Sequence, residues 1–183
     1  MKDPPYLWGG YSQFMYLHPD AMLQVVPPQV SVHTAVLFSP IANGVKWAQR
    51  TPGLRLGDAI VILGPGQQGL GCVLAASLTG ANPIIVAGLQ RDAKRLGVAN
   101  ELGATHTIFS DRVPLDQQAR EILGAEMADV VVDVSGSTAA QVVTVDLVRR
   151  GRGRFPSLMV IHCHPQRQFG PQKSSGARGR LYV

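Results

Sequence analysis

Cysteine is scarce in this 183-residue chain: Cys72 and Cys163 lie far apart and form no C-x-x-C pair. This scarcity excludes a small disulfide-stapled scaffold and predicts a reduced setting, so we expect a cytoplasmic location. Long apolar runs are also lacking, since none approaches the roughly 18 residues that a membrane-spanning helix needs. Residues 1–10 contain no apolar core of a signal peptide. We therefore expect neither secretion nor a membrane partner.

Acidic residues are absent from residues 149–183, although eight basic residues lie there. Residues 1–148 carry nine basic and twelve acidic side chains, so the net charge of +5 comes from the tail. The tail is rich in Pro, Gly, Ser, Gln and Arg, and apart from one candidate strand, SLMVIHC, it is predicted to be disordered. It lacks interleaved aromatic residues and any nucleic-acid-binding motif, which argues against a nucleic-acid partner. A non-enzymatic module that binds nucleic acid through the basic tail is kept as one alternative for the function of the chain.

Strands and helices alternate regularly from Gly57 onward. Continuous apolar runs, typical of sheets covered on both faces, predict strands at 58–64, 82–88, 105–110 and 128–136. Helical patterns predict helices at 67–79, 92–102, 114–123 and 137–150. Ser137 is the expected N-cap of the last helix. The alternation predicts right-handed βαβ units, and hence an α/β fold with a doubly wound, parallel, Rossmann-type sheet.

Residues 1–50 show a less regular pattern. The segment GGYSQFMYL, residues 9–17, alternates enough to predict a strand. Residues 32–50 carry apolar side chains at helical intervals and predict a helix that is interrupted at Pro40 and Gly44.

A glycine-rich turn follows the first predicted strand of the alternating region, with Gly64, Gly66 and Gly69 at the spacing G-x-G-x-x-G. Gly64 permits a tight turn, Gly66 lets a pyrophosphate approach the backbone, and Gly69 lets the helix pack closely on the strand. The pyrophosphate would bind free N–H groups at the helix N-terminus. The alternative is a purely structural turn. The residues expected to hold a dinucleotide here are Gly64, Pro65, Gly66, Gln67, Gln68 and Gly69.

The end of the second predicted strand, where an acidic residue normally binds the adenosine ribose, is Gly88. The nearest acid, Asp92, fits better as a first-turn or N-cap residue of the following helix. Arg91, Lys94 and Arg95 cluster here and would suit a 2′-phosphate, which slightly favours NADP over NAD. A solvated helix face explains Lys94 at least as well.

Three further features were candidates for site residues. Ser135 follows the fourth predicted strand, at the sheet edge where ligands bind, and it either faces the cofactor or caps the next turn. Cys72 is expected to be a packed thiol without a reactive role. His162 and His164 share one face if their segment is a strand, but two ligands without a further partner do not make a zinc site.

The segments GGYSQFMYL, SPIANGVKWA, GDAIVILGPGQQGLGCVLAASLTGANPIIVAGL, ANELGATHTIF and ADVVVDVSGS follow one another over residues 8–150. Their order and spacing resemble the medium-chain dehydrogenase/reductase superfamily, and within it the zinc-type alcohol dehydrogenases. The resemblance implies a Rossmann cofactor domain joined to a catalytic domain. It also implies NAD(P) as cofactor and hydride transfer between nicotinamide and an alcohol or carbonyl.

The chain departs from the family pattern at the metal motifs. No cysteine precedes Cys72, and the family's G-H-E motif and four-cysteine loop are absent. The family's further zinc ligand maps to Ser39, and serine is a poor ligand for zinc. The resemblance therefore implies zinc in full-length relatives, but neither a metal site nor a catalytic residue in this chain. Asn43, one helical turn on, lies where relatives place the nicotinamide ring, and a helix-breaking Asn-Gly pair is an equally good explanation.

The family pattern ends at Arg152, and the switch to acid-free sequence resembles a changed reading frame or a truncated gene model, with a genuine evolved tail as the alternative. We expect a remnant of the catalytic domain with its connecting helix at 1–50, an incomplete Rossmann domain at 51–150 and the basic tail at 151–183. The predicted function is the NAD(P)-binding portion of a zinc-type alcohol dehydrogenase-like oxidoreductase, inactive alone. Homo-oligomers are expected of full-length relatives rather than of this chain. A zinc-free member resembling quinone or enoyl reductases is the other interpretation.

Overall fold

The computed structural model describes residues 10–151 and 154, and the chain divides into two compact units, Met1–Phe38 and Ser39–Val183. The described part of the first unit contains a short helix, α1 (Val32–Ala35), whose N-cap Ser31 accepts a hydrogen bond from the Thr34 N–H at 3.1 Å. The strand expected at 9–17 is wrong for the described residues of that segment, because no neighbouring strand supplies ladder hydrogen bonds there. No helix of the described residues is long and apolar enough to cross a membrane.

The second unit is built around a four-stranded sheet in the order β3-β2-β1-β4. All three strand pairs are parallel, with Ile60 opposite both Ile84 and Val130. The α/β fold with a doubly wound parallel sheet is therefore confirmed. In chain order the elements are α2 (Phe38–Gly44, from Ser39 in this unit), the π-helical segment η1 (Val45–Arg50), β1 (Ile60–Leu63), α3 (Gln67–Thr79), β2 (Ile84–Gly88), the 3₁₀ turn η2 (Gln90–Asp92), α4 (Ala93–Glu101), β3 (His106–Phe109), α5 (Leu115–Leu123), the 3₁₀ turn η3 (Gly124–Glu126), β4 (Val130–Asp133) and α6 (Thr138–Leu147).

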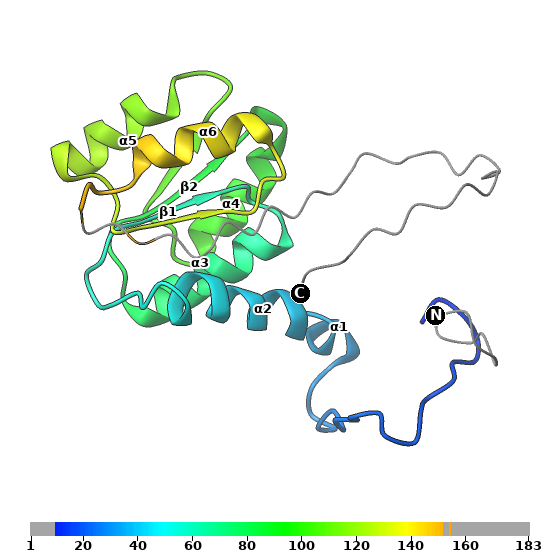
Figure 1. Ribbon diagram of the computed structural model, residues 1–183. Coiled ribbons are helices and arrows are strands. Elements are labelled where there is room, and N and C mark those ends of the chain that lie inside the picture. Colours follow the sequence, from blue (N-terminus) through cyan, green and yellow to red (C-terminus); the bar gives the residue numbers. More distant parts are fainter. Residues whose placement is uncertain (1–9, 152–153, 155–183) are drawn as a thin grey trace, which may run out of the picture. The chain divides into compact units, whose positions relative to one another are not determined.

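Helices cover both faces of this sheet (Figure 1), and an apolar core lies against each face. Ile60 and Ile62 of β1 point into a core with α3, α4 and η1, whereas Val61 and Leu63 point into a core with α5 and α6. Every residue of β1 and β2 is buried. Burial on both faces explains why these strands are continuous apolar runs rather than alternating ones.

Pro40 does not interrupt the helix at the start of the second unit, contrary to the sequence expectation, whereas the regular α-helix does end at Gly44, where the π-helical segment η1 follows directly. Pro40 lies in the first turn of α2, where a missing N–H removes no intrahelical bond. A Cβ on Gly44 would come within 3.0 Å of the backbone of Gly71 in α3, and a Cβ on Gly71 would come equally close to the Pro40 carbonyl. Glycine at both positions therefore permits a close crossing of the two helices.

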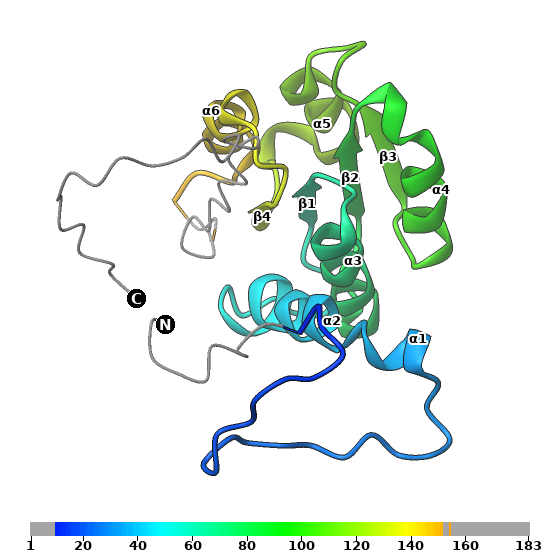
Figure 2. The same ribbon diagram turned by 90° about the vertical axis from the view of Figure 1, so that its right-hand side faces the viewer.

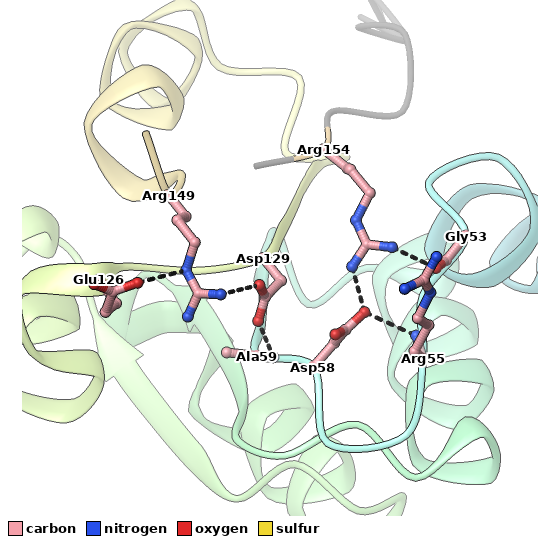
Figure 3. A network of polar contacts seen from close by, with 8 residues as sticks. All are labelled: Gly53, Arg55, Asp58, Ala59, Glu126, Asp129, Arg149 and Arg154. Atoms are coloured by element: carbon pink, nitrogen blue, oxygen red, sulfur yellow. Dashed lines mark hydrogen bonds and ion pairs between the residues drawn. The ribbon is translucent and has the colours of Figure 1, made fainter. Parts of the chain in front are cut away.

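Ionic contacts tie the chain together at the amino ends of the strands (Figure 3). Arg149 lies after α6 and pairs with Asp129 at 2.7 Å and with Glu126 at 3.2 Å. The other oxygen of Asp129 accepts a hydrogen bond from the Ala59 N–H at 3.0 Å. The end of α6 is thereby fastened to the starts of β1 and β4.

Arg154 continues this network beyond the end of the expected Rossmann segment. Its N–H donates to the Asp129 carbonyl at 2.8 Å, it forms a parallel bridge with Val130, and its guanidinium pairs with Asp58 (Figure 3). Arg154, a residue of the expected tail, is therefore packed against the start of β4. The remainder of the expected tail lies outside the described residues.

Candidate functional site

The glycine-rich turn connects β1 to α3 and is fixed by close backbone packing. Gly64 has a φ of +97°, and its N–H donates to the Ala87 carbonyl at 2.9 Å. A Cβ on Gly64 would lie 2.7 Å from Ser135 Cα, and one on Gly69 would come within 3.0 Å of the Gly64 carbonyl oxygen. Side chains at these two positions would therefore push apart β1, α3 and the loop that follows β4.

Unbonded backbone N–H groups lie at the N-terminus of α3, and the space beside its N-cap residue is open. The first intrahelical bond runs from the Leu70 N–H to the carbonyl of the N-cap Gly66 at 2.9 Å, so the N–H groups of Gln67, Gln68 and Gly69 have no intrahelical acceptor. No side chain caps them, and no acidic residue lies in the first turn. A Cβ on Gly66 would meet nothing within 4 Å. Free donors, a positive helix end and open space together fit a phosphate group.

Gly88 ends β2 beside this turn, and its surroundings explain why no acidic residue stands there. A Cβ on Gly88 would lie 2.8 Å from Pro65 Cγ and 3.4 Å from Leu96 Cδ2. The ring of Pro65 therefore occupies the volume that the first carbon of an aspartate or glutamate side chain would need. An acidic residue at this position, the ribose contact of NAD-binding folds, would require the Pro65 ring to shift.

Two of the charged residues after Gly88, Asp92 and Arg95, form an ion pair with each other. Asp92 is the N-cap residue of α4, as expected, and its carboxylate accepts a hydrogen bond from the Leu89 N–H at 3.2 Å and pairs with Arg95 at 3.0 Å. Arg91 is exposed, and no described residue forms an ion pair with it. Of the two arginines expected to bind the cofactor, Arg91 is the one whose charge is not offset by a neighbouring carboxylate.

Three residues at this end of the sheet were missed by sequence reasoning. The backbone N–H of Gln90 donates to the two carboxylate oxygens of Asp111, just after β3, at 3.1 Å each, and Arg112 Nε donates to Gln90 Oε1 at 2.8 Å. Asp111 could have been found because β3 and β2 are parallel neighbours, so their carboxyl ends meet at one edge. These contacts hold the loop after β2 and bring a third arginine to it.

Ser135 packs against the glycine turn through its backbone, whereas its hydroxyl is used locally. Ser135 Oγ donates to Asp133 Oδ1 at 2.7 Å and accepts from the Ser137 N–H at 3.1 Å. These bonds favour the turn-forming role, and a cofactor contact by Ser135 stays a prediction. Ser137 is the N-cap of α6, as expected, and its hydroxyl accepts from the Ala140 N–H at 3.4 Å.

Asn43 and Gln68 are brought together from two different helices. Asn43 Nδ2 in α2 lies 3.3 Å from Gln68 Oε1 in the first turn of α3. α2 ends at Gly44, directly after Asn43, and a π-helical segment follows, so a cofactor contact by Asn43 stays a prediction. Ser39 is exposed on the same helix, and the described residues contain no cluster of three His, Cys, Asp or Glu side chains suited to a metal ion.

Cys72 lies in α3 with no exposed surface. Burial raises the pKa of its thiol to about 12, so the reactive thiolate is scarce at neutral pH. The residue is part of the core between α3 and the sheet, in keeping with the expected packing role. His162, Cys163 and His164 lie outside the described residues.

Comparisons with known proteins agree on the kind of protein that this site belongs to. The family model for zinc-binding dehydrogenases matches residues 69–166. The probable alcohol dehydrogenase of Mycobacterium tuberculosis is 38% identical over 139 residues, which cover 74% of this chain and 37% of that protein. The structure of an Escherichia coli oxidoreductase of unknown specificity matches 69% of this chain and 35% of its own, with a TM-score of 0.64 and 29% identity.

A zinc-binding dehydrogenase of Sinorhizobium meliloti, solved with NADP bound, matches 72% of this chain and 40% of its own, with a TM-score of 0.60 and 26% identity. The chain thus spans less than half of the length of each of these three relatives.

Proposed function

This chain belongs to the zinc-binding dehydrogenase family, and from that premise we propose that it is the NAD(P)-binding part of an alcohol dehydrogenase-like oxidoreductase. The reaction of the whole enzyme would be hydride transfer between the nicotinamide and an alcohol or carbonyl. Within the chain, the proposed division is a catalytic-domain remnant with its connecting helix at 1–50, the cofactor domain at 51–150 and a basic tail at 151–183.

The N-terminus of α3 is the observation that carries the proposal. The N–H groups of Gln67, Gln68 and Gly69 precede the first intrahelical bond, and the space above Gly66 is open. Gly64 and Gly69 hold this end of the helix against β1. A bound dinucleotide would supply the hydride chemistry, and the chain's role would be to hold its pyrophosphate on these donors.

We propose NADP rather than NAD as the preferred cofactor. The ring of Pro65 fills the place of a ribose-binding acid at Gly88, whereas the exposed Arg91 is available for a 2′-phosphate. Arg95 contributes less, because Asp92 pairs with it at 3.0 Å. The relative from Sinorhizobium meliloti solved with NADP bound supports this preference.

We also propose that the chain alone binds cofactor without turning over alcohols. Ser39 stands where zinc-type relatives carry a metal ligand, and its hydroxyl is a poor substitute for a thiolate, imidazole or carboxylate. The zinc-free reductases of the same superfamily are the second candidate, which Ser39 favours equally. Metal analysis of a longer relative that carries serine at this position would separate the two.

A titration tests the binding proposal directly. The purified chain is titrated into NADPH, and in parallel into NADH, while the fluorescence of the reduced nicotinamide is followed. Circular dichroism on the same sample verifies the folded α/β unit. We expect a saturable change with tighter binding of NADPH. Folded protein that gives no saturable change with either nucleotide would contradict the proposal.

A further inference from the structure

A pocket of about 760 Å³ lies at the amino edge of the sheet, opposite to the edge that carries the glycine turn. Its wall is formed by the last turn of α5, the 3₁₀ turn η3, the end of α6 and the residues that follow α6 (Figure 2). Pockets of this size are typical of small-molecule sites. Dinucleotides bind at the carboxyl ends of the strands, so the proposed function does not account for this pocket.

The charged side chains that line the pocket are only partly paired. Arg120 and Arg150 are exposed, and neither forms an ion pair with a described residue. Of the two carboxylates in the wall, Glu126 pairs with Arg149 at 3.2 Å, whereas Asp146 pairs with no described residue. The lining therefore presents two uncompensated guanidinium groups against one uncompensated carboxylate.

The backbone that carries two of these arginines is held in place by the sheet (Figure 3). The Arg149 N–H donates to the Ala128 carbonyl at 2.8 Å, and Arg149 Nη1 donates to Asp129 at 2.7 Å. Arg150 follows directly, so its Cα is positioned by the same contacts. A guanidinium group carries more N–H donors than the contacts of Arg149 with Asp129 and Glu126 use. Arg149 can therefore keep these contacts and still donate to a ligand.

Backbone strain marks the wall of the same pocket. Met127 has a φ of +60° and a ψ of −169°, a combination that is essentially confined to glycine. Its side chain is buried in the core beneath α5 and α6, which holds the residue in this conformation. Residues that are held in such strained conformations cluster at active sites and ligand-binding sites. The strain at Met127 therefore supports a binding role for this edge of the sheet.

We propose that this pocket binds a small organic dianion through Arg120, Arg149 and Arg150. The planar fork of a guanidinium group pairs with a carboxylate or a phosphate through two parallel hydrogen bonds. Two uncompensated guanidinium groups suit a ligand with two negative charges, which is either a dicarboxylate or a phosphate ester. Asp146 disfavours ligands of higher negative charge, because like charges repel.

Calorimetric titration of the full chain at low ionic strength tests this with succinate, with inorganic phosphate, and with succinamide as the neutral isostere of succinate. We expect saturable binding of succinate or phosphate and none of succinamide, and the tighter of the two anions identifies the anionic group. Arg120→Gln and Arg150→Gln should each weaken the binding of that anion at least about tenfold, the worth of a charge-assisted hydrogen bond.

Arg50→Gln is the matched control, because Arg50 is exposed, lies in the last turn of η1 and forms no ion pair with a described residue. Its affinities should equal those of the wild type, and circular dichroism verifies that each variant is folded. Folded wild-type protein that binds neither anion, or that binds succinamide equally well, overturns the inference. Equal affinities of the wild type, Arg120→Gln and Arg150→Gln also overturn it, and so does an equal loss in Arg50→Gln.

Discussion

Two alanine substitutions in the glycine turn should separate folding from binding. A Cβ on Gly69 would come within 3.0 Å of the Gly64 carbonyl oxygen, a backbone atom that cannot rotate away. Gly69→Ala must therefore lift the start of α3 from β1, at a cost typical of overpacking, about 3 kcal/mol. For a domain of this size that corresponds to a melting temperature lower by about 10 °C.

Gly66→Ala should act in the opposite way. Gly66 has φ −73° and ψ −178°, which any residue adopts, and its Cβ would meet nothing within 4 Å. The folding cost is limited to the poorer capping by alanine, about 0.5–1 kcal/mol. The added methyl group would instead occupy the open space at the helix N-terminus and weaken NADPH binding at least about tenfold, since the pyrophosphate needs close backbone approach.

Thermal melts by circular dichroism and NADPH titrations on both variants provide the assay. The expected pattern is a lowered melting temperature for Gly69→Ala, and near-native stability with weakened binding for Gly66→Ala. Wild-type stability of Gly69→Ala would refute the packing argument. Wild-type affinity of Gly66→Ala would refute the placement of the pyrophosphate above this residue.

Three other predictions concern charge and burial. Arg91→Gln should weaken NADPH binding about five- to tenfold and change NADH binding less than about twofold, and equal losses would contradict a 2′-phosphate contact. Asp129→Asn should lower the free energy of unfolding by about 2 kcal/mol in urea titrations, because Arg149 loses its closest counter-charge at 2.7 Å; unchanged stability would show that the pair contributes nothing. With the Cys72 pKa raised from 9.0 to about 12, the unfolded chain loses this proton first, so stability should fall as pH rises from 9 towards 12. Cys72→Ala should flatten that pH dependence, and an identical slope in the variant would exclude the thiol as its source.

The sheet could be predicted from sequence because its strands are buried on both faces. Ile60–Leu63 and Ile84–Gly88 are apolar runs whose only stable surroundings are helices above and below. Strand ends were less predictable. The last strand was expected at 128–136 but spans Val130–Asp133, because ladder pairing, and not apolar character, decides where a strand ends.

A helix was predicted over residues 32–50, but the roles of Pro40 and Gly44 within it could not be predicted from the local sequence. Pro40 is harmless only because α2 begins two residues earlier. Gly44 is required by the backbone of Gly71, a residue in a different helix. Neither role has a local sequence signal.

The candidate site, too, could be predicted from the sequence only in part. The spacing of Gly64, Gly66 and Gly69 marks the turn, since the three glycines lie together between one predicted strand and the helix that follows it. The contact between Gly88 and Pro65, and the use of Asp111 to hold Gln90, arise only when neighbouring strands align their carboxyl ends. Sequence reasoning indicated some of the residues at this edge, but it missed Gln90, Asp111 and Arg112 and the hydrogen bonds between them.

Amide hydrogen exchange on the chain with and without saturating NADPH tests the central claim most directly. The account predicts that exchange slows at the N–H groups of Gln67, Gln68 and Gly69, which the pyrophosphate would take as hydrogen-bond donors. Exchange at Gln117, on the opposite face of the sheet, should not change. Saturating NADPH that leaves the first turn of α3 exchanging as in the free chain would contradict the account.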